Sequence, residues 1–318
     1  DTYNGAYAYY GETNWLKLFY KPNTTSQTHD ISVRGSSKKL SYAITGRYFT
    51  QEGIYKVGDD DYDQFNIRAK GTLRVTDWLS FDNNTSVFHT NQQQSMFTTG
   101  SILGKQIEQH GQPILVPYNE NGTYTLAAAK TGYASFTDGN TGQIEENLTL
   151  VTTTGVNISL IKDVLKFRGD YSFKAIRRER ERYRAPLTFW LSDNSFTEYV
   201  PQANSYKSRW TYDTNYQTAN AYFTFTPKLG ENHELNVVVG GNMEDYQYNR
   251  FYIQRKGMLI PDKWQSYELF DGIDYTIEQN DSSYGVLGLF GRLNYTLLRR
   301  YILEVAARYD GSSKFPET

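Results

Sequence analysis

The chain has 318 residues, no cysteine, 8 prolines and a formal net charge of −2. No apolar run approaches the roughly 18 residues of a membrane helix, and the mean hydropathy is −0.65, so a helical membrane protein is excluded. The near-neutral charge gives no support to nucleic-acid binding. The absence of cysteine excludes a disulfide framework and a thiolate zinc site. No apolar signal segment starts the chain, and we expect any export signal to lie outside it.

Aromatic residues are unusually abundant. They make up 16% of the chain, whereas the hydrophobic fraction is only 38%. A soluble domain usually contains about 45–50% apolar residues in a count that includes glycine. In transmembrane β-barrels, a thin lipid-facing apolar layer alternates with polar lumen residues, and aromatic girdles lie at both interfaces. The composition therefore favours a transmembrane β-barrel.

Residues 1–25 show no clear alternation and are predicted to form a lead-in loop or a short helix, whereas 26–318 are predicted to form a β-barrel segment. In 65–76 and 165–175, the odd positions are apolar or small and the even positions are polar. About ten segments follow such a period of two, some of them more weakly. These candidate strands are 26–34, 39–50, 65–76, 78–90, 144–160, 165–175, 209–226, 235–244, 283–297 and 301–310. Many exceed the about 5–6 residues of a soluble strand and suffice for a membrane crossing.

The connections between these strands alternate in length along the chain. The short ones are 35–38, 77, 161–164, 227–233 and 298–300. The longer ones between them are 51–62, 91–143, 177–208 and 250–282. Outer-membrane barrels have short periplasmic turns and longer extracellular loops. The pattern predicts an all-β fold, an antiparallel transmembrane barrel segment, and an extracellular loop 91–143 that contacts a lid or the substrate.

Several stretches resemble SusC/RagA-type TonB-dependent transporters. The most specific is the hairpin 294–310 with the loop that follows it, in which Asp310-Gly311-Ser312-Ser313 precedes Lys314-Phe315. The runs 13–16, 27–35 and 41–53 support the resemblance, which extends collinearly over most of the chain. It implies a barrel of about 22 strands, of which this chain would supply fewer than half.

The resemblance also implies a function and partners. Members of this family import oligosaccharides or peptides across the outer membrane of Bacteroidetes, driven by TonB-ExbB-ExbD through a plug domain. A SusD-like surface lipoprotein closes over the barrel as a lid. We therefore expect contacts with that lipoprotein, with the remainder of the barrel, and with outer-membrane lipid and lipopolysaccharide. No cofactor and no nucleic acid are expected. The chain lacks the plug and ends in a loop, so it is interpreted as an internal piece whose two edge strands need partners in lipid.

An arginine-rich run continues the strand 165–175 toward the long-loop side. If the alternation holds, four of its arginines lie at even positions and face the lumen, as Lys166 and Arg168 are expected to do. These are Arg178, Arg180, Arg182 and Arg184. Guanidinium groups on one face would attract carboxylate or phosphate groups of a substrate. The alternative is a solvated strand extension paired with acidic neighbours, and a bulge would instead turn the arginines toward lipopolysaccharide.

Two further groups are candidate contacts. Arg68, Lys70 and Arg74 form a basic face deeper in the lumen, either paired within the barrel wall or with the plug, or lining a substrate track. Aromatic residues of the long loops present flat faces on which sugars stack. The candidates are Trp190, Tyr199, Trp264 and Tyr267. Girdle positions or packing inside the loops explain these aromatics equally well.

Catalytic and metal-binding signatures are missing from the sequence. The histidines His29, His89, His110 and His233 are scattered without metal spacing. The acidic stretch 58–63 lacks the glycine and distal glutamate of an EF-hand loop. No nucleophile elbow or P-loop is present. We therefore predict no enzyme activity and no metal site.

Two other functions fit parts of the pattern. A complete ten-stranded barrel would be a porin, an adhesin or a surface hydrolase, since small bacterial barrels have even strand numbers. A soluble β-rich carbohydrate-binding protein would share the aromatic content. Detergent dependence separates the soluble alternative from both barrel hypotheses.

Overall fold

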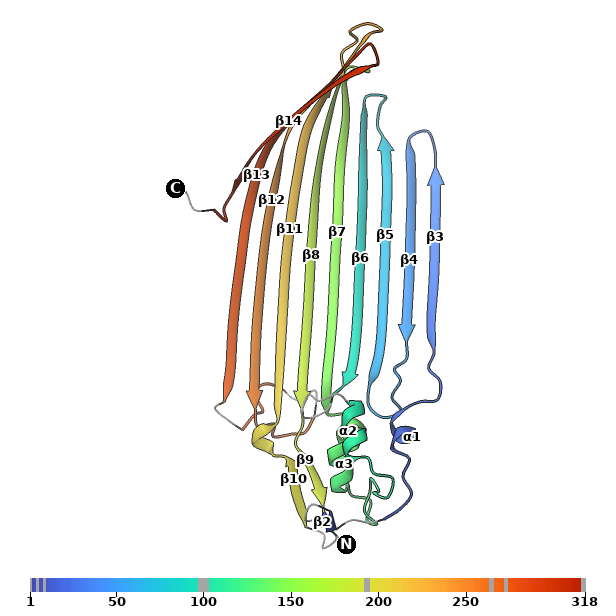
Figure 1. Ribbon diagram of the computed structural model, residues 1–318, viewed down its shortest axis with the longest axis vertical. Helices are drawn as coiled ribbons and strands as arrows, with labels where there is room; N and C mark the ends of the chain where they lie inside the picture. Colours follow the sequence, from blue (N-terminus) through green and yellow to red (C-terminus); the bar gives the residue numbers. More distant parts are fainter. Residues whose placement is uncertain are drawn as a thin grey trace.

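The main body of the protein is one antiparallel sheet of ten long strands. The computed structural model describes residues 2–3, 6–7, 10–96, 103–191, 195–262, 266–271 and 274–315. The sheet has the order β14-β13-β12-β11-β8-β7-β6-β5-β4-β3 (Figure 1). Its strands are β3 (Ser26–Ser36), β4 (Leu40–Gln51), β5 (Asp60–Arg74), β6 (Leu79–Ser95), β7 (Thr141–Ile161), β8 (Leu165–Arg184), β11 (Tyr206–Phe225), β12 (His233–Lys256), β13 (Tyr275–Leu297) and β14 (Tyr301–Ser312).

Each predicted strand corresponds to one strand of this sheet. The largest difference is at β12, which continues to Lys256, well beyond the predicted end at residue 244. Beyond that point nearly all side chains are polar or aromatic, with Ile253 as the exception, so the alternation disappears although the backbone pairing with β11 continues. The length of β12 is set by its pairing with β11, and the sequence of β12 alone does not reveal that length.

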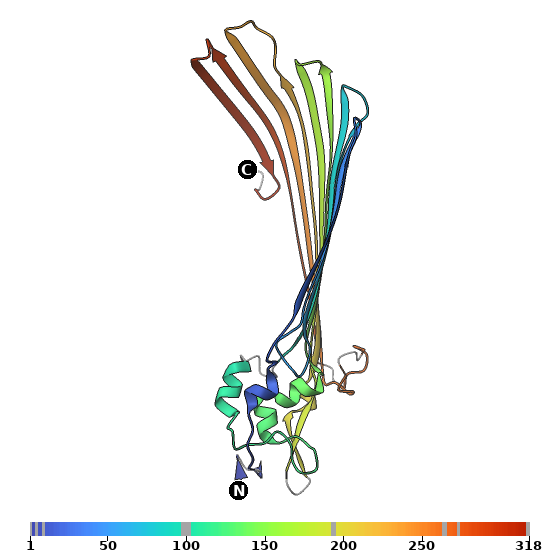
Figure 2. The same ribbon diagram turned by 90° about the vertical axis from the view of Figure 1, so that its right-hand side faces the viewer.

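Short turns join the strands at one end and long connections join them at the other. Strand β8 follows β7 directly, whereas forty-five residues separate β6 from β7, between Ser95 and Thr141. Figure 2 shows the helices gathered at the end that carries the long connections. The predicted alternation of short and long connections is therefore confirmed by the topology.

Short elements in the long connections make up a loop layer at that end. They are α1 (Trp15–Phe19), α2 (Leu103–His110), α3 (Leu126–Thr131), α4 (Tyr133–Asp138), β9 (Leu187–Trp190), β10 (Phe196–Val200) and the 3-10 turn Gln202–Asn204; β1 (Thr2–Tyr3) pairs with β2 (Ala6–Tyr7). The Asn14 side chain caps α1 by accepting from the amide of Lys17 at 2.9 Å. Gly132 adopts φ 88° between α3 and α4, a conformation that suits glycine. The sequence did not predict these helices in 91–143, because they are too short to show a helical period.

The loop layer, rather than the sheet, contains the buried apolar core. Phe19, Ala128 and Ala129 are completely buried, and Phe136 is 2% exposed. Phe19 packs edge-on against the rings of Tyr133 and Phe136, with centroid distances of 5.6 and 5.8 Å. Helices α1, α3 and α4 and strand β9 therefore form one packed unit over the end of the sheet.

The register of the sheet separates an apolar face from a polar face. We call the face that carries the odd positions of β5 and β8 the apolar face, and the opposite one the polar face. Apolar side chains lie opposite one another from strand to strand. Examples are Ile67 opposite Val87, Phe167 opposite Phe223, and Phe223 opposite Val239. Many stay exposed, such as Ile31 at 70% and Leu289 at 61%. The predicted grouping of odd positions in 65–75 and 165–175 is thus confirmed.

No helix within the described residues is long and apolar enough to cross a membrane. The strands are long enough to do so, since a tilted crossing needs about 9–11 residues. An exposed apolar band across a whole sheet requires a nonaqueous neighbour or another layer. The structure therefore fits the transmembrane barrel segment that the sequence predicts.

Val239 and Val238 are neighbours on opposite faces and provide a matched test of that arrangement. Val239, on the apolar face, is 56% exposed. If it lies against lipid near the midplane, Val239→Arg should lower the free energy of unfolding by about 2–4 kcal/mol. Val238→Arg should cost much less because its side chain stays hydrated. Denaturant titration in detergent or vesicles measures both, and equal costs would contradict the assignment of the faces.

Candidate functional site

The arginine-rich end of β8 keeps its alternation up to the last residue of the strand. Its pairing with β11 runs without a shift from Leu165 to Arg184. The one irregularity between β7 and β8 lies at the opposite end, between Ser159 and Ile161. The four arginines predicted to share a face therefore do so, on the polar face. They are Arg178, Arg180, Arg182 and Arg184.

Two of these arginines hold one carboxylate. Glu145 lies on β7 opposite Arg180. Its Oε1 is 2.7 Å from Arg178 Nη2 and its Oε2 is 2.6 Å from Arg180 Nε. The Glu145 side chain is only 14% exposed. The alternative of an acidic partner on a neighbouring strand is thus realised for one half of the arginine row.

Arg182 donates to an amide on the neighbouring strand β7, and Arg184 donates to a backbone carbonyl in the 3-10 turn Gln202–Asn204. Arg182 Nε donates to Gln143 Oε1 at 2.6 Å. Arg184 Nε donates to the Asn204 carbonyl oxygen at 3.1 Å. Arg182 thus has a neutral amide as its partner, whereas Arg178 and Arg180 share a carboxylate.

Aromatic rings of β11 lie beneath the arginines. Three guanidinium carbons lie 5.1–5.5 Å from ring centroids. The pairs are Arg178 over Tyr212, Arg182 over Trp210 and Arg184 over Tyr206. Guanidinium groups are attracted to aromatic faces within about 6 Å. The rings of β11 therefore help to hold these three guanidinium groups in place on the polar face.

The aromatic surface continues across β12 and β13. Trp210 stacks on Tyr252 with a centroid distance of 4.6 Å, and Tyr246 stacks on Tyr284 at 5.0 Å. All of these rings are half-buried. We call the polar-face residues Arg178, Arg180, Arg182, Arg184, Trp210, Tyr212, Tyr246, Tyr252 and Tyr284 the aromatic–arginine surface.

The sequence analysis missed the aromatic half of this surface. Residues 209–218 are polar at the odd positions and aromatic or threonine at the even ones, so they show no aliphatic alternation. A usable signal exists in the parity of the aromatics, since Tyr206, Trp210, Tyr212 and Tyr216 are all even. Their joining with the rings of β12 depends on register, which sequence does not supply.

The opposite face at the same level carries a compact ion cluster. The Glu181 side chain is 8% exposed and lies 3.0 Å from Lys207 Nζ and 2.7 Å from Arg209 Nη2. The Tyr267 ring covers Lys207 and Arg209, with centroid distances of 5.5 and 6.0 Å. Burial raises the pKa of Tyr267, which lies in a loop. Tyr267, a predicted sugar contact, thus packs against these ion pairs, on the face opposite to the aromatic–arginine surface.

Trp190 and Tyr199, two other predicted loop contacts, lie in the loop layer. Trp190 is half-buried at the end of β9, and its ring lies 5.3 Å from that of Phe196. Tyr199 is half-buried and packs against the loop-layer core. Trp264 lies outside the described residues. Packing inside the loops, one of the alternatives from the sequence, accounts for Tyr199.

The loop layer also holds a small polar cluster beside its core. The Tyr124 hydroxyl donates to Asp138 Oδ1 at 2.8 Å. Burial raises the pKa of the Asp138 carboxyl, and the hydrogen bond from Tyr124 lowers it in part. Burial also raises the pKa of Tyr118 to about 12. The hydrogen bond from Tyr124 links the segment before α3 to the end of α4.

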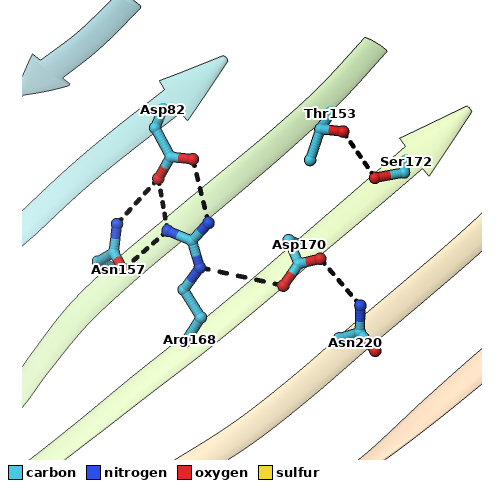
Figure 3. A network of polar contacts seen from close by, with 7 residues as sticks. All are labelled: Asp82, Thr153, Asn157, Arg168, Asp170, Ser172 and Asn220. Carbon is cyan, nitrogen blue, oxygen red and sulfur yellow. Dashed lines mark hydrogen bonds and ion pairs between the residues drawn. The ribbon is translucent and has the colours of Figure 1, made fainter. Parts of the chain in front are cut away.

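Deeper on the polar face, charged side chains are bound within the wall. Figure 3 shows Arg168 between Asp82 and Asp170, with Arg168 Nη2 3.0 Å from Asp82 Oδ2. Asn157 accepts from Arg168 and donates to Asp82, at 2.9 and 3.0 Å. Asp170 lies on β8 with Arg168, whereas Asp82 lies on β6 and Asn157 on β7, so this network ties the three strands together.

The second basic group lies on the same face. Arg68 Nε donates to Asn84 Oδ1 at 2.8 Å. Lys70 lies directly opposite Asn84 on β6. Arg74 borders a hollow at the turn end, together with Lys38 and Lys39. Their position on the polar face agrees with the parity of the sequence, and their role stays a prediction. Within the described ranges, no three His, Asp or Glu side chains gather as a metal site requires.

Comparisons with known proteins bear on the family. The chain is 22% identical over 323 residues to TonB-dependent receptor P26 of Formosa agariphila, covering 97% of this chain and 30% of that protein. It is 24% identical over 342 residues to TonB-dependent receptor SusC of Bacteroides thetaiotaomicron, covering 95% and 30%. No family model matches. The chain thus spans 30% of the length of these curated relatives.

Solved structures show the same fold. The RagAB peptide transporter matches with a TM-score of 0.73 and 19% identity, over 99% of this chain and 35% of that chain. The RagAB peptide importer in the 'closed-closed' state matches with a TM-score of 0.69. The predicted resemblance to SusC/RagA-type TonB-dependent transporters is confirmed, and so is the fold as a segment of their outer-membrane barrel. These relatives are named as receptors and transporters. The division of the chain at residue 25 stays a prediction.

Phe19 tests whether the loop layer is a unit of its own. Phe19→Ala should destabilise that layer by about 3–5 kcal/mol, because it removes a fully buried aromatic ring. Amide hydrogen exchange should accelerate in α3 and α4 while β7 and β8 keep their protection. Leu16→Ala in the same helix is the control, since Leu16 is 60% exposed. Equal acceleration in the strands would mean that layer and sheet unfold together.

Proposed function

We propose that this chain forms part of the wall and outer rim of a TonB-dependent importer of oligosaccharides or peptides. The observation that carries the proposal is the continuous apolar face across ten strands, combined with the likeness to TonB-dependent receptors over nearly the whole chain. The apolar face would lie against lipid, and the polar face would line the lumen. The chain then supplies a conduit and binding contacts rather than chemistry.

Partners would supply the energy and the closure. TonB-ExbB-ExbD would act through the plug domain, and a SusD-like lipoprotein would close over the loops. The names of the relatives support this, since one is a TonB-dependent receptor named SusC and one neighbour is the RagAB peptide transporter. The loop layer has its own core. It is therefore firm enough to serve as a docking rim for such a lid.

The polar face would carry the substrate contacts. We assign the outer contacts to the arginine row of β8, and the inner basic positions Arg68, Lys70 and Arg74 to the lumen or the plug. Trp190 would contribute at the rim, beside Phe196, which is 59% exposed. The roles of Tyr199, Trp264 and Tyr267 as sugar contacts remain proposals; the packing of Tyr267 on Lys207 and Arg209 favours a structural role.

The open sheet argues against the alternative of a small complete barrel. In the described part of the chain, β3 pairs only with β4 and β14 pairs only with β13. A sheet with unpaired edges is not stable in hydrocarbon. The remainder of the same barrel is therefore the expected partner of both edges. A soluble carbohydrate-binding protein would have to cover the apolar face by another layer.

Adjacent positions of β8 test the orientation of the wall. The chain has no cysteine, so Lys166→Cys and Phe167→Cys introduce single thiols on opposite faces. In outer membranes containing the full-length protein, a water-soluble maleimide should label position 166. Only a lipid-soluble reagent should label position 167. The reverse pattern would place lipid on the polar face and refute the proposal.

Uptake in cells tests the transport function itself. A strain that depends on this protein for growth on an oligosaccharide or peptide should lose uptake when either the full-length protein or TonB is removed. Removal of the lipoprotein partner should reduce uptake at low substrate concentration. Uptake that persists at the normal rate without TonB would reject energised import and favour a passive porin.

A further inference from the structure

The aromatic–arginine surface combines two features that one class of ligand would use together. We infer that it binds acidic oligosaccharides, sugars that carry carboxylate or sulfate groups, with Arg182 and Trp210 as the residues that determine specificity. The inference rests on the proposed import function and names the class of substrate. It concerns the loop end of the polar face, where a ligand enters.

The surface already binds one carboxylate of its own. Glu145 lies between Arg178 and Arg180 at 2.7 and 2.6 Å, and its side chain is 14% exposed. Arg178 Nε is buried and has no hydrogen-bond partner among the described residues. Glu145 thus shows how guanidinium groups two residues apart on this strand hold an anion, and it competes with any ligand for those two arginines.

Arg182 lies one step closer to the loop end and faces a neutral partner. Gln143 lies opposite Arg182 on β7, just as Glu145 lies opposite Arg180. Its Oε1 accepts from Arg182 Nε at 2.6 Å. The amide orients the guanidinium without neutralising its charge. A guanidinium has five N–H donors, and carboxylate or sulfate groups accept two of them side by side. The geometry leaves the edge of Arg182 to an anionic group of the ligand.

The rings beside Arg182 suit sugars. Arg182 lies 5.4 Å from the centroid of Trp210, and Trp210 stacks on Tyr252 at 4.6 Å. Sugar rings stack on Trp and Tyr faces and hydrogen-bond to the polar edges of those residues. The polar-face positions of 206–216 and 246–256 carry no aliphatic side chain. Aspartate and glutamate side chains have no flat apolar face that could stack on these rings, so an acidic sugar fits better than an acidic peptide.

Binding to the purified full-length transporter with its lipoprotein partner tests the inference. The probes are oligogalacturonate and chondroitin sulfate oligosaccharides, neutral xylo-oligosaccharides of similar length, and oligo-aspartate. At least one acidic sugar should bind, and Arg182→Gln should weaken it about tenfold at low salt. The loss should shrink as salt rises, because screening weakens the attraction in both proteins. Trp210→Ala should weaken binding with little salt dependence.

Two further variants separate this effect from damage to the fold. Arg177→Gln removes the same charge from the opposite face of the same strand, where Arg177 pairs with Asp213 at 3.0 Å, and should leave binding unchanged. Glu145→Gln should tighten binding of the acidic sugar severalfold, because it releases Arg178 and Arg180. A gain of affinity cannot arise from misfolding.

Each contrary outcome has a distinct meaning. The inference fails if no acidic sugar binds, if neutral sugars bind equally well, or if Arg182→Gln has no effect. Oligo-aspartate bound as tightly as the sugars would show a peptide or purely electrostatic site and would also overturn it. TonB-dependent uptake of a neutral substrate would reject this inference alone, whereas uptake without TonB would reject the proposed function.

Discussion

Strand register is the constraint on which the two faces of this sheet depend. Successive side chains point to opposite faces, so a slip of one residue would exchange the apolar and polar sets of a strand. Nine strand pairings keep the apolar positions aligned from Ile31 in β3 to Val305 in β14. The Arg168–Asp82–Asn157 network reinforces that alignment, because its hydrogen bonds form only in one register of β6, β7 and β8. This single alignment of the strands separates the apolar face from the polar face.

The arginines of the polar face have different partners at different levels of the sheet. Deep in the sheet, an arginine pairs with a carboxylate of another strand, as Arg168 of β8 does with Asp82 of β6 across β7. Toward the loops, the partners become neutral amides and aromatic rings, as at Arg182. Partly exposed ion pairs contribute only about 0–1 kcal/mol each. This change of arginine partners along the polar face therefore affects where an anion is attracted more than it affects the stability of the fold.

The loop layer provides the rigidity that a binding rim needs. Its core rests on rings such as Phe19 and Phe136 and on the alanines of α3. The aromatic–arginine surface lies just below it, on strands that project past the length of a membrane crossing. Pre-organised side chains lose less conformational freedom on binding. A packed loop layer next to the aromatic rings of the polar face is thus suited to hold a binding surface in place.

The sequence by itself determined the ten strands, their two faces and the side on which the long connections lie. Those features follow from local periodicity, since side chains alternate at every residue of a strand. It also identified the arginine row, because Arg178 to Arg184 continue the parity of Arg168. Only the tertiary structure decided that Glu145 pairs with two of these arginines and that Trp210 and Tyr252 lie beside a third, Arg182. It likewise decided that Tyr267 covers ion pairs instead of facing the lumen. Such contacts join residues far apart in the chain, and they depend on strand pairing and loop packing that no local pattern encodes.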